Sequence, residues 1–358
     1  MNSRSMNKFY GWLLIVLLAL IGPTQPLVAA PLRQDQAAKR AADALMAEGT
    51  TLFQQQRLDA ALTKLEAACP LYQQAGLQTE EARCWQAVGQ TKLNLGDPTG
   101  ALTAYQTSVA FWQSLGDHFW EVVTLSQIAG ILHHTNQYDA AEQVYKQLPA
   151  LLDSVLADAN RPLLPEEKAG LGNIYNNMAL FYSITGRYAV AFDLYEQALA
   201  IHAELDNYGA IAATIDNQGT IFAKLGYYRQ ALDLYDLALR FAQQLYEAQL
   251  GEAAAVATIQ SNMGVAYAAL GDYQQALKLY QEASKLAQQA DDPEGEEANL
   301  LNQGLAFNAL GQKLQALAAF TQALSIAQDI DDWQGEAAAF NNLADMNAKG
   351  GEYETALE

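Results

Sequence analysis

The sequence predicts an all-α solenoid, in which helical hairpins stack one on another along the chain. A phrase recurs eight times, in which a small residue is followed twelve residues later by an alanine. The small residues are Gly49, Gly89, Ala129, Ala179, Gly219, Gly264, Gly304 and Ala344, and the alanines are Ala61, Ala101, Ala141, Ala191, Ala231, Ala276, Ala316 and Ala356. Successive small residues are separated by 40, 40, 50, 40, 45, 40 and 40 residues. A fixed period in this range is typical of a solenoid.

The composition agrees with helices throughout. Apolar residues make up 51% of the 358 residues, and Ala, Leu, Gln and Glu, which favour helices, outnumber Val, Ile and Thr. Each hairpin of a solenoid buries its apolar face only against its neighbours. Such an architecture leaves little room for a buried active site, so we expect a protein that is not an enzyme and has no cofactor.

The sixth repeat shows how one unit is built. Gly264 lies on the first helix and Ala276 on the second, and both are small because the two helices approach closely there. Tyr267 and Tyr280 fill the space around this contact. Gly271 fits the left-handed residue that ends a helix. Polar residues at equivalent places are expected to be N-caps of first helices; they are Asp117, Asn207, Asp292 and Asp332.

The two longer steps mark departures from the period. A ten-residue excess after the third repeat contains Pro149, Pro162 and Pro165, and Pro149 falls where the second helix should continue. We therefore expect that helix to end early or to kink. The predicted parts are repeats 1–3 at residues 31–150, a joint at 151–165, and repeats 4–8 at 166–358. The five-residue excess before Gln260 lacks proline and is expected to lengthen two helices.

Residues 1–30 are expected to be a secretion signal. Arg4 and Lys8 precede an apolar run at residues 12–21, and small residues follow it, which is the order found in signal peptides. Cleavage after Ala29 and cleavage after Ala30 are both compatible with the pattern. The alternative is an uncleaved anchor, but a membrane span needs about 18 or more apolar residues. We expect an exported protein, periplasmic, extracellular or at the cell surface.

The charge of the chain restricts the class of partner. Twenty Lys and Arg against forty Asp and Glu give a net charge of −20. This balance disfavours nucleic acid, whose binders carry basic patches, and anionic membrane surfaces. An acidic surface would steer basic partners towards the protein. The alternative is that most of these charges are solvated helix faces.

The repeated phrase resembles the tetratricopeptide repeat, a helix-turn-helix module of about 34 residues. Trp85, four residues before Gly89, stands where that family's pattern has its tryptophan. The longer period is similar to the 40-residue variant of bacterial CHAT-associated and adaptor-type members. The resemblance begins near Ala37 and continues to the end of the chain. It implies a right-handed superhelical solenoid whose first helices line a concave groove, and a scaffold for protein–protein interaction.

In repeats 4–8, each first helix has an asparagine two residues before its small residue. This asparagine column consists of Asn177, Asn217, Asn262, Asn302 and Asn342. Asparagine inside a helix costs roughly 0.5 kcal/mol against alanine, so five in register need a reason. The resemblance implies contact with the backbone of a bound peptide, because an amide both donates and accepts hydrogen bonds. The alternative is that the amides join neighbouring first helices.

Other residues complete or restrict the predicted groove. Val265 and Leu305 are expected to line it beside the column. Repeats 1–3 lack the column and have Ala47, Ala87 and Gln127 at its place. The flanking residues are Asn176, Asp216, Ser261, Leu301 and Asn341. None of them is basic, so the carboxylate clamp of some family members, which grips acidic tails, is not expected.

Cys69 and Cys84 are the two cysteines of the chain. They are equally distant from the turn predicted near Gly76, so they are expected to face each other across two antiparallel helices. An exported protein permits a disulfide, provided that the Cα atoms come within about 7 Å. The alternative is two small buried residues that are not bonded.

Catalytic and metal-binding signals are absent from the sequence. The histidines are His118, His133, His134 and His202, and none belongs to the paired-histidine motif of zinc proteases. No Gly-x-Ser-x-Gly turn is present either. Asp291, Asp292 and Glu294 form an acidic group, but we expect them to favour the following helix N-terminus through its dipole.

Two further expectations concern the end of the chain. Glu358 falls within the second helix of the eighth repeat, whereas a solenoid normally closes with a polar capping helix. Bacterial proteins with similar repeats often continue into a CHAT domain, a caspase-like fold with a His and Cys pair. The alternative function is therefore a regulatory or substrate-positioning part of a larger protease. End-to-end self-association through the eighth repeat is the second of these expectations.

Overall fold

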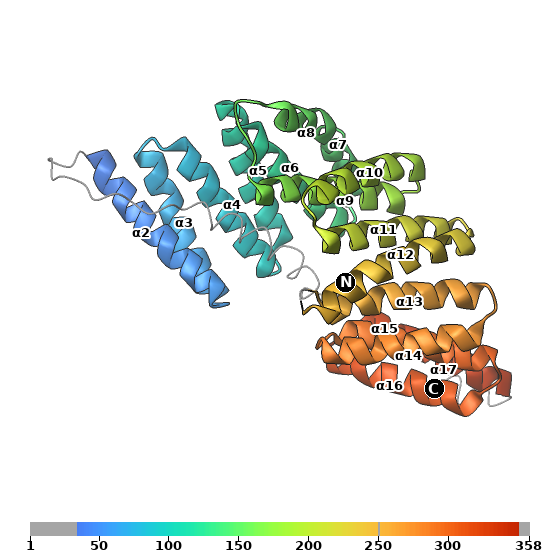
Figure 1. The fold of residues 1–358 in the computed structure, drawn as a ribbon. Coiled ribbons are helices and arrows are strands. Elements are labelled where there is room, and N and C mark those ends of the chain that lie inside the picture. The colour runs from blue at the N-terminus through green and yellow to red at the C-terminus, as the bar shows by residue number, and fades with distance from the viewer. Residues whose placement is uncertain (1–33, 250, 351–358) are drawn as a thin grey trace. The chain divides into compact units, whose positions relative to one another are not determined.

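The computed structural model describes residues 34–249 and 251–350 (Figure 1). Every regular element in this part of the chain is a helix, which confirms the predicted all-α solenoid. The predicted secretion signal, the alanine of the eighth repeat at position 356 and the end of the chain lie outside the described residues. No helix of the described part is both long enough and apolar enough to span a bilayer.

The chain divides into two compact units, residues 1–178 and 179–358. The helices before the boundary are α2 (Gln34–Gln54), α3 (Leu58–Gln74), α4 (Gln78–Asn94), α5 (Pro98–Leu115), α6 (His118–His134), α7 (Tyr138–Tyr145) and α8 (Leu148–Ala157). The boundary falls inside α9 (Pro165–Ile184), after the joint expected at 151–165.

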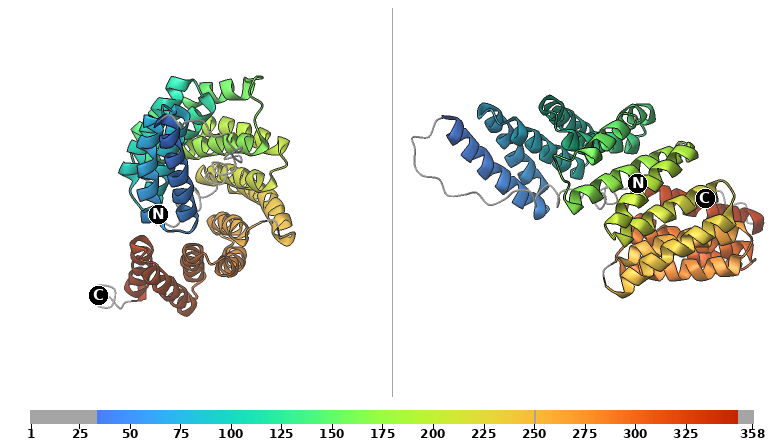
Figure 2. Two further views of the ribbon diagram at one scale, coloured as in Figure 1. Left: turned by 90° about the vertical axis from the view of Figure 1, so that its left-hand side faces the viewer. Right: turned by 45° about the horizontal axis from the view of Figure 1, so that its top comes forward.

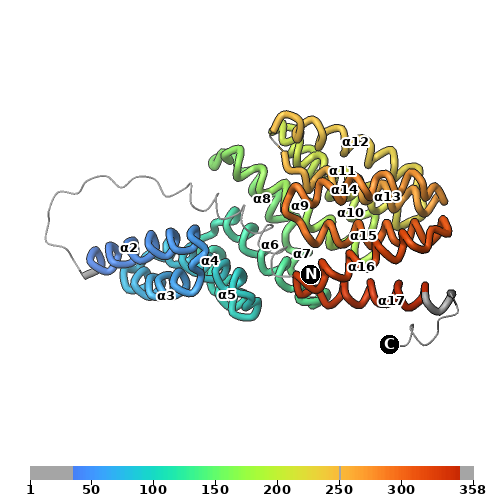
Figure 3. The backbone as a smooth tube through the Cα atoms, turned by 90° about the horizontal axis from the view of Figure 1, so that it is seen from below, coloured from blue at the N-terminus to red at the C-terminus, as the bar shows by residue number. Residues whose placement is uncertain are grey.

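The helices of the second unit are α10 (Tyr188–Glu204), α11 (Tyr208–Lys224), α12 (Tyr228–Glu247), α13 (Ala253–Ala269), α14 (Tyr273–Gln289), α15 (Pro293–Ala309), α16 (Lys313–Asp329) and α17 (Trp333–Gly350). Within this unit, consecutive helices pack against each other in chain order (Figures 2 and 3). The same holds from α2 to α7 in the first unit. Each pair of consecutive helices is thus a hairpin that buries its apolar side against the next pair.

The close approach predicted at the small residues is present. A Cβ atom added to Gly264 would lie 2.5 Å from Cε1 of Tyr280, which is far inside contact distance. Ala276 and Tyr280 are both buried. Gly271 has φ +84°, the left-handed conformation expected where the first helix ends.

The predicted N-caps also form. The side chains of Asp117, Asn207 and Asp292 each accept a hydrogen bond from the backbone N–H three residues ahead, at 3.2, 3.3 and 3.2 Å. Asp332 accepts one from the N–H of Gln334 at 3.0 Å. These bonds satisfy donors that the first turn of a helix otherwise leaves free.

The two insertions have different effects. After the third repeat the second helix ends at Tyr145, and a separate helix, α8, begins beside Pro149. The five extra residues before Gln260 lengthen α12 to 20 residues, whereas α13 keeps the 17 residues of α11. The expectation of two lengthened helices is therefore wrong, because the rest of the excess lies in the turn between α12 and α13.

Candidate functional site

The inner layer of the second unit is formed by the first helices of its repeats. In the described part, α11 contacts α13, α13 contacts α15 and α15 contacts α17. No comparable contact joins α12, α14 and α16 to one another. Since helices on the concave side of a curved stack approach more closely, α11, α13, α15 and α17 form the inner side of this unit.

Asn262 of the asparagine column is engaged by a neighbouring helix. Its Nδ2 lies 3.0 Å from each carboxylate oxygen of Asp216, which is on α11. The bond joins two successive first helices, so at this position the arrangement is the inter-helix tie that was the alternative to peptide contact. Asp216 is missing from the predicted site, although it stands directly before the column in the fifth repeat.

The environment of Asp216 disfavours its charge. The residue is 7% exposed, and burial raises the pKa of its carboxyl to about 6, while the hydrogen bond from Asn262 opposes that shift. Burial, and secondarily the charge of Asp216, raises the pKa of Tyr195 on α10. The Tyr195 hydroxyl is buried without a hydrogen-bond partner among the described residues. The hydrogen bond from the neutral Asn262 amide is therefore the main interaction that offsets the cost of burying the Asp216 carboxylate.

The other members of the column differ from Asn262. The Asn342 Nδ2 donates to the carbonyl oxygen of Ala338, within its own helix, at 2.9 Å. Asn217 also has an interaction. Asn302 is half-buried and has no hydrogen-bond partner in the described part of the chain. Asn177 lies on α9 before the unit boundary, so it does not belong to the inner layer of the second unit.

Two apolar side chains on the inner helices are exposed. Val265 on α13 is 45% exposed and Leu305 on α15 is 49% exposed. Both stand one residue after the small residue of their first helix. Val265 and Leu305 are therefore exposed apolar side chains on two of the inner helices, and Leu305 stands three residues after Asn302 on α15.

In the first unit, the equivalent inner positions hold buried glutamines. Gln127, at the place of the column, is buried, and so is Gln86 on the preceding first helix. The Gln86 Nε2 donates to Oγ1 of Thr124 at 2.7 Å, which links α4 to α6. The inner polar groups of this unit are thus enclosed by its own helices.

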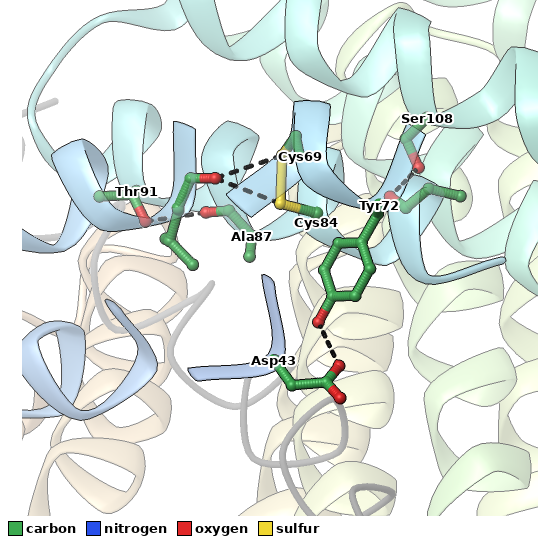
Figure 4. The surroundings of a disulfide bond; sticks show 9 residues. Asp43, Cys69, Tyr72, Cys84, Ala87, Thr91 and Ser108 are labelled. Atoms are coloured by element: carbon green, nitrogen blue, oxygen red, sulfur yellow. Dashed lines mark hydrogen bonds between the residues drawn. A yellow bond between two sulfur atoms is a disulfide. The ribbon is translucent and has the colours of Figure 1, made fainter. Parts of the chain in front are cut away.

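Cys69 and Cys84 are joined in a disulfide between α3 and α4, with their Cα atoms 5.5 Å apart (Figure 4). Both residues are fully buried. Near the bond, the Tyr72 hydroxyl donates to Asp43 at 3.0 Å. The bond connects the second helix of repeat one to the first helix of repeat two.

The described residues hold no group of three or more His, Cys, Asp or Glu side chains arranged to bind a metal ion. His202 is completely buried, and neither ring nitrogen has a partner among these residues. Burial lowers the pKa of His202, so the ring is held neutral. This arrangement suits a packed side chain rather than a ligand.

Three solved structures illustrate the similarity of this fold to known proteins. The apo form of the quorum sensor NprR from B. thuringiensis has 15% identity and a TM-score of 0.67, covering 99% of this chain and 90% of that one. BtubC from P. vanneervenii has 25% identity and a TM-score of 0.53, covering 65% and 91%. A Rap protein complexed with competence and sporulation factor has 13% identity and a TM-score of 0.53, covering 89% and 95%.

No curated protein sequence matches the chain. The family model of the tetratricopeptide repeat matches three segments, residues 80–152, 170–244 and 255–329. These segments make up more than half of the chain and include six of its eight repeat phrases. The match agrees with the stacked hairpins, the close approach at Gly264 and the left-handed Gly271. The chain therefore belongs to the tetratricopeptide repeat family.

Proposed function

We propose that the second unit is an interaction scaffold that holds an extended peptide segment of a partner protein in the groove lined by α11, α13, α15 and α17. The observation that carries the proposal is Asn302, an amide on the inner layer with no intramolecular partner among the described residues. A half-buried amide without a partner gains most when a ligand supplies both a donor and an acceptor. An extended peptide backbone does so at every residue.

The neighbouring side chains support the same class of ligand. Val265 and Leu305 offer apolar contact area to alternate side chains of an extended chain. The net charge of −20 favours a basic partner through electrostatic steering. A Rap protein of similar fold forms a complex with competence and sporulation factor, which supports a peptide or protein ligand for this chain as well.

The test begins with the full chain immobilised and a displayed library of random dodecapeptides. Peptides selected by the wild type are then measured by fluorescence polarisation against Asn302→Ala. Loss of one or two hydrogen bonds of about 1 kcal/mol each should weaken binding roughly 5- to 30-fold. Asn160→Ala, an exposed asparagine of the first unit, is the matched control and should leave the affinity unchanged.

Circular dichroism of each variant verifies that the fold is intact. Equal affinity of the wild type and Asn302→Ala for every selected peptide would remove the asparagine column from the binding mechanism. If the library yields no peptide at all, the groove does not hold extended peptides. The proposal then fails.

We also propose that the protein is exported. The signal-like residues 1–30 and the buried disulfide support this, because disulfides persist mainly in oxidising compartments. Amino-terminal sequencing of the protein from its natural source should give a chain beginning at residue 30 or 31. Recovery of the intact amino terminus from the cytoplasm would refute export.

Two alternatives remain as proposals of lower rank. A role as the regulatory part of a CHAT-type protease requires a His and Cys pair downstream of Glu358, which the reading frame would reveal. End-to-end self-association predicts a sedimentation coefficient that rises with concentration. Neither alternative depends on Asn302, so the substitution at that residue separates them from peptide binding.

A further inference from the structure

Glu297 of α15 is buried against the start of α17, between the seventh and eighth repeats. It is 5% exposed and stands seven residues before Gly304, the small residue of its helix. Three other first helices have a buried alanine at the equivalent place, namely Ala82, Ala212 and Ala257. The seventh repeat therefore has an ionisable side chain at a place where these repeats pack through a methyl group.

The carboxylate of Glu297 lies directly beside Gly335, in the first turn of α17. A Cβ atom added to Gly335 would lie 2.5 Å from Oε1 of Glu297 and 2.9 Å from its Oε2. The close approach thus requires a residue without a side chain on α17. Since α15 and α17 contact each other, this carboxylate is part of the interface that holds the eighth repeat on the seventh.

Among the described residues, no group offsets the charge of this carboxylate. Glu297 forms no ion pair and no hydrogen bond with them, and its Oε1 is buried. Two backbone N–H groups in the first turn of α17 are already taken, because Gln334 and Glu336 both donate to Asp332, at 3.0 Å each. Burying an ionised carboxylate without a donor is costly, so the interface between α15 and α17 favours the neutral carboxyl.

The charges around Glu297 act in the same direction as its burial. Burial, followed by the negative charges of Asp332 and Glu294, raises the pKa of Glu297 to about 7. Of the helices that pack on α15, α13 has no charged residue. The charged residues of α14 and α16, and those among the described side chains of α17, form no ion pair with Glu297; they are Lys278, Glu282, Lys285, Lys313, Asp329, Glu336 and Asp345.

We propose that the contact of Glu297 with α17 is a proton-dependent switch between the seventh and eighth repeats. With Glu297 protonated, α17 docks on α15 and α16; with Glu297 ionised, α17 separates from them while the earlier repeats stay folded. Each repeat of a solenoid contacts only its neighbours, so one interface can open without unfolding the others. The switch is independent of peptide binding to the groove.

The direction of the switch follows from proton linkage. The folded interface raises the pKa of Glu297 from an ordinary 4.5 to about 7, so the docked state binds the proton more tightly than the open state. The proton therefore stabilises docking fully below about pH 4.5, and this contribution is lost progressively as the pH rises to about 7. The eighth repeat should be docked in acid and open more often at neutral pH.

The experiment is hydrogen exchange of the full chain, followed by mass spectrometry at about pH 4.5 and about pH 7.5, with each rate divided by the intrinsic rate at that pH. Glu297→Gln keeps the size of the side chain and removes its charge. At the higher pH, this variant should protect the amides of α17 about tenfold or more above the wild type. At the lower pH, the two proteins should agree to within about threefold. Protection of α11 should be the same in both proteins at each pH.

Two further variants separate charge from packing. Glu297→Ala introduces the residue found at the equivalent places of other repeats, and the ratio of α17 to α11 protection should no longer change with pH. Asp329→Asn, an exposed carboxylate at the end of α16, is the control and should exchange as the wild type does. Equal protection of α17 in wild type and Glu297→Gln at both pH values would overturn the proposal. So would a difference in α11 as large as that in α17, because the whole unit would then be unfolding.

Discussion

Opening the Cys69–Cys84 disulfide should destabilise the first unit and leave the second unchanged. The two cysteines are 15 residues apart in sequence, and closing a loop of that length lowers the entropy of the unfolded chain by an amount that corresponds to about 3 kcal/mol. For a unit of this size, 1 kcal/mol shifts the midpoint by about 2–4 °C, so reduction should lower it by roughly 6–12 °C. The second unit contains no cysteine, and solenoid repeats contribute stability through nearest neighbours.

The assay is differential scanning calorimetry of the full chain with and without a phosphine reductant. The double variant Cys69→Ala, Cys84→Ala is the control: it should unfold at the reduced midpoint and be insensitive to reductant. Hydrogen exchange measured by mass spectrometry assigns the shifted transition to α2–α5 or to other helices. Equal midpoints for the wild type and the double variant in oxidising buffer would refute the reasoning, and a shift confined to the second unit would refute the nearest-neighbour argument.

Three further predictions concern the second unit. Burial raises the pKa of Asp216 to about 6 from an ordinary value of 3.8, so the folded state favours the protonated carboxyl and wild-type stability should fall as the pH rises from about 4 to 6. In urea titrations, Asp216→Asn should remove that decline and raise the free energy of unfolding above pH 6 by on the order of 3 kcal/mol. Burial lowers the pKa of His202, so stability should be lost as pH falls below the unfolded value of about 6.5, and His202→Leu should flatten that acid limb in the same titration. Gly304→Ala would force its Cβ into Phe320, costing about 1–3 kcal/mol of packing against a gain of about 1 kcal/mol in helix propensity; the control Gly209→Ala, where the nearest atom would be 3.8 Å away, should stabilise the protein in the same thermal assay.

Each of these predictions has a result that would contradict it. Parallel pH curves for wild type and Asp216→Asn between pH 4 and 6 would mean that the carboxylate is solvated or paired in solution. An unchanged acid limb in His202→Leu would place the acid sensitivity elsewhere. A gain in stability for Gly304→Ala equal to that of Gly209→Ala would show that Phe320 yields without cost.

The parts of the fold that depend on local rules were predictable from the sequence. The close contact at Gly264 follows from a small residue twelve positions before an alanine, and the left-handed Gly271 follows from its place after a helix. Asp117 and its equivalents form caps because a short polar side chain reaches the free N–H groups of a first turn. These signals are strong because the same residue types recur at equivalent positions of several repeats.

Features that depend on irregular steps were not predictable in the same way. The five extra residues before Gln260 could be divided between two helices, a turn, or both, and periodicity does not distinguish these outcomes. The contact of Arg161 in the inserted loop with Phe119 at the start of α6 joins residues 42 positions apart, and no periodic pattern encodes it. The unit boundary inside α9 depends on how many residues pack on either side of it, which no local pattern encodes.

The asparagine column lies between these two cases, and its members differ because their neighbours on the preceding first helix differ. Asn262 faces Asp216, a carboxylate 46 residues earlier, and donates to both of its oxygens. The equivalent neighbour of Asn342 is Leu301, which accepts nothing, and Asn342 donates instead to its own helix. The equivalent neighbour of Asn302 is Ser261, whose side chain is too short to take the part of Asp216. Each asparagine of the column thus depends on the residue that precedes the column in the previous repeat. Where that residue accepts a hydrogen bond, the amide joins two helices; Asn302 lacks such an acceptor, so we expect a ligand to engage it.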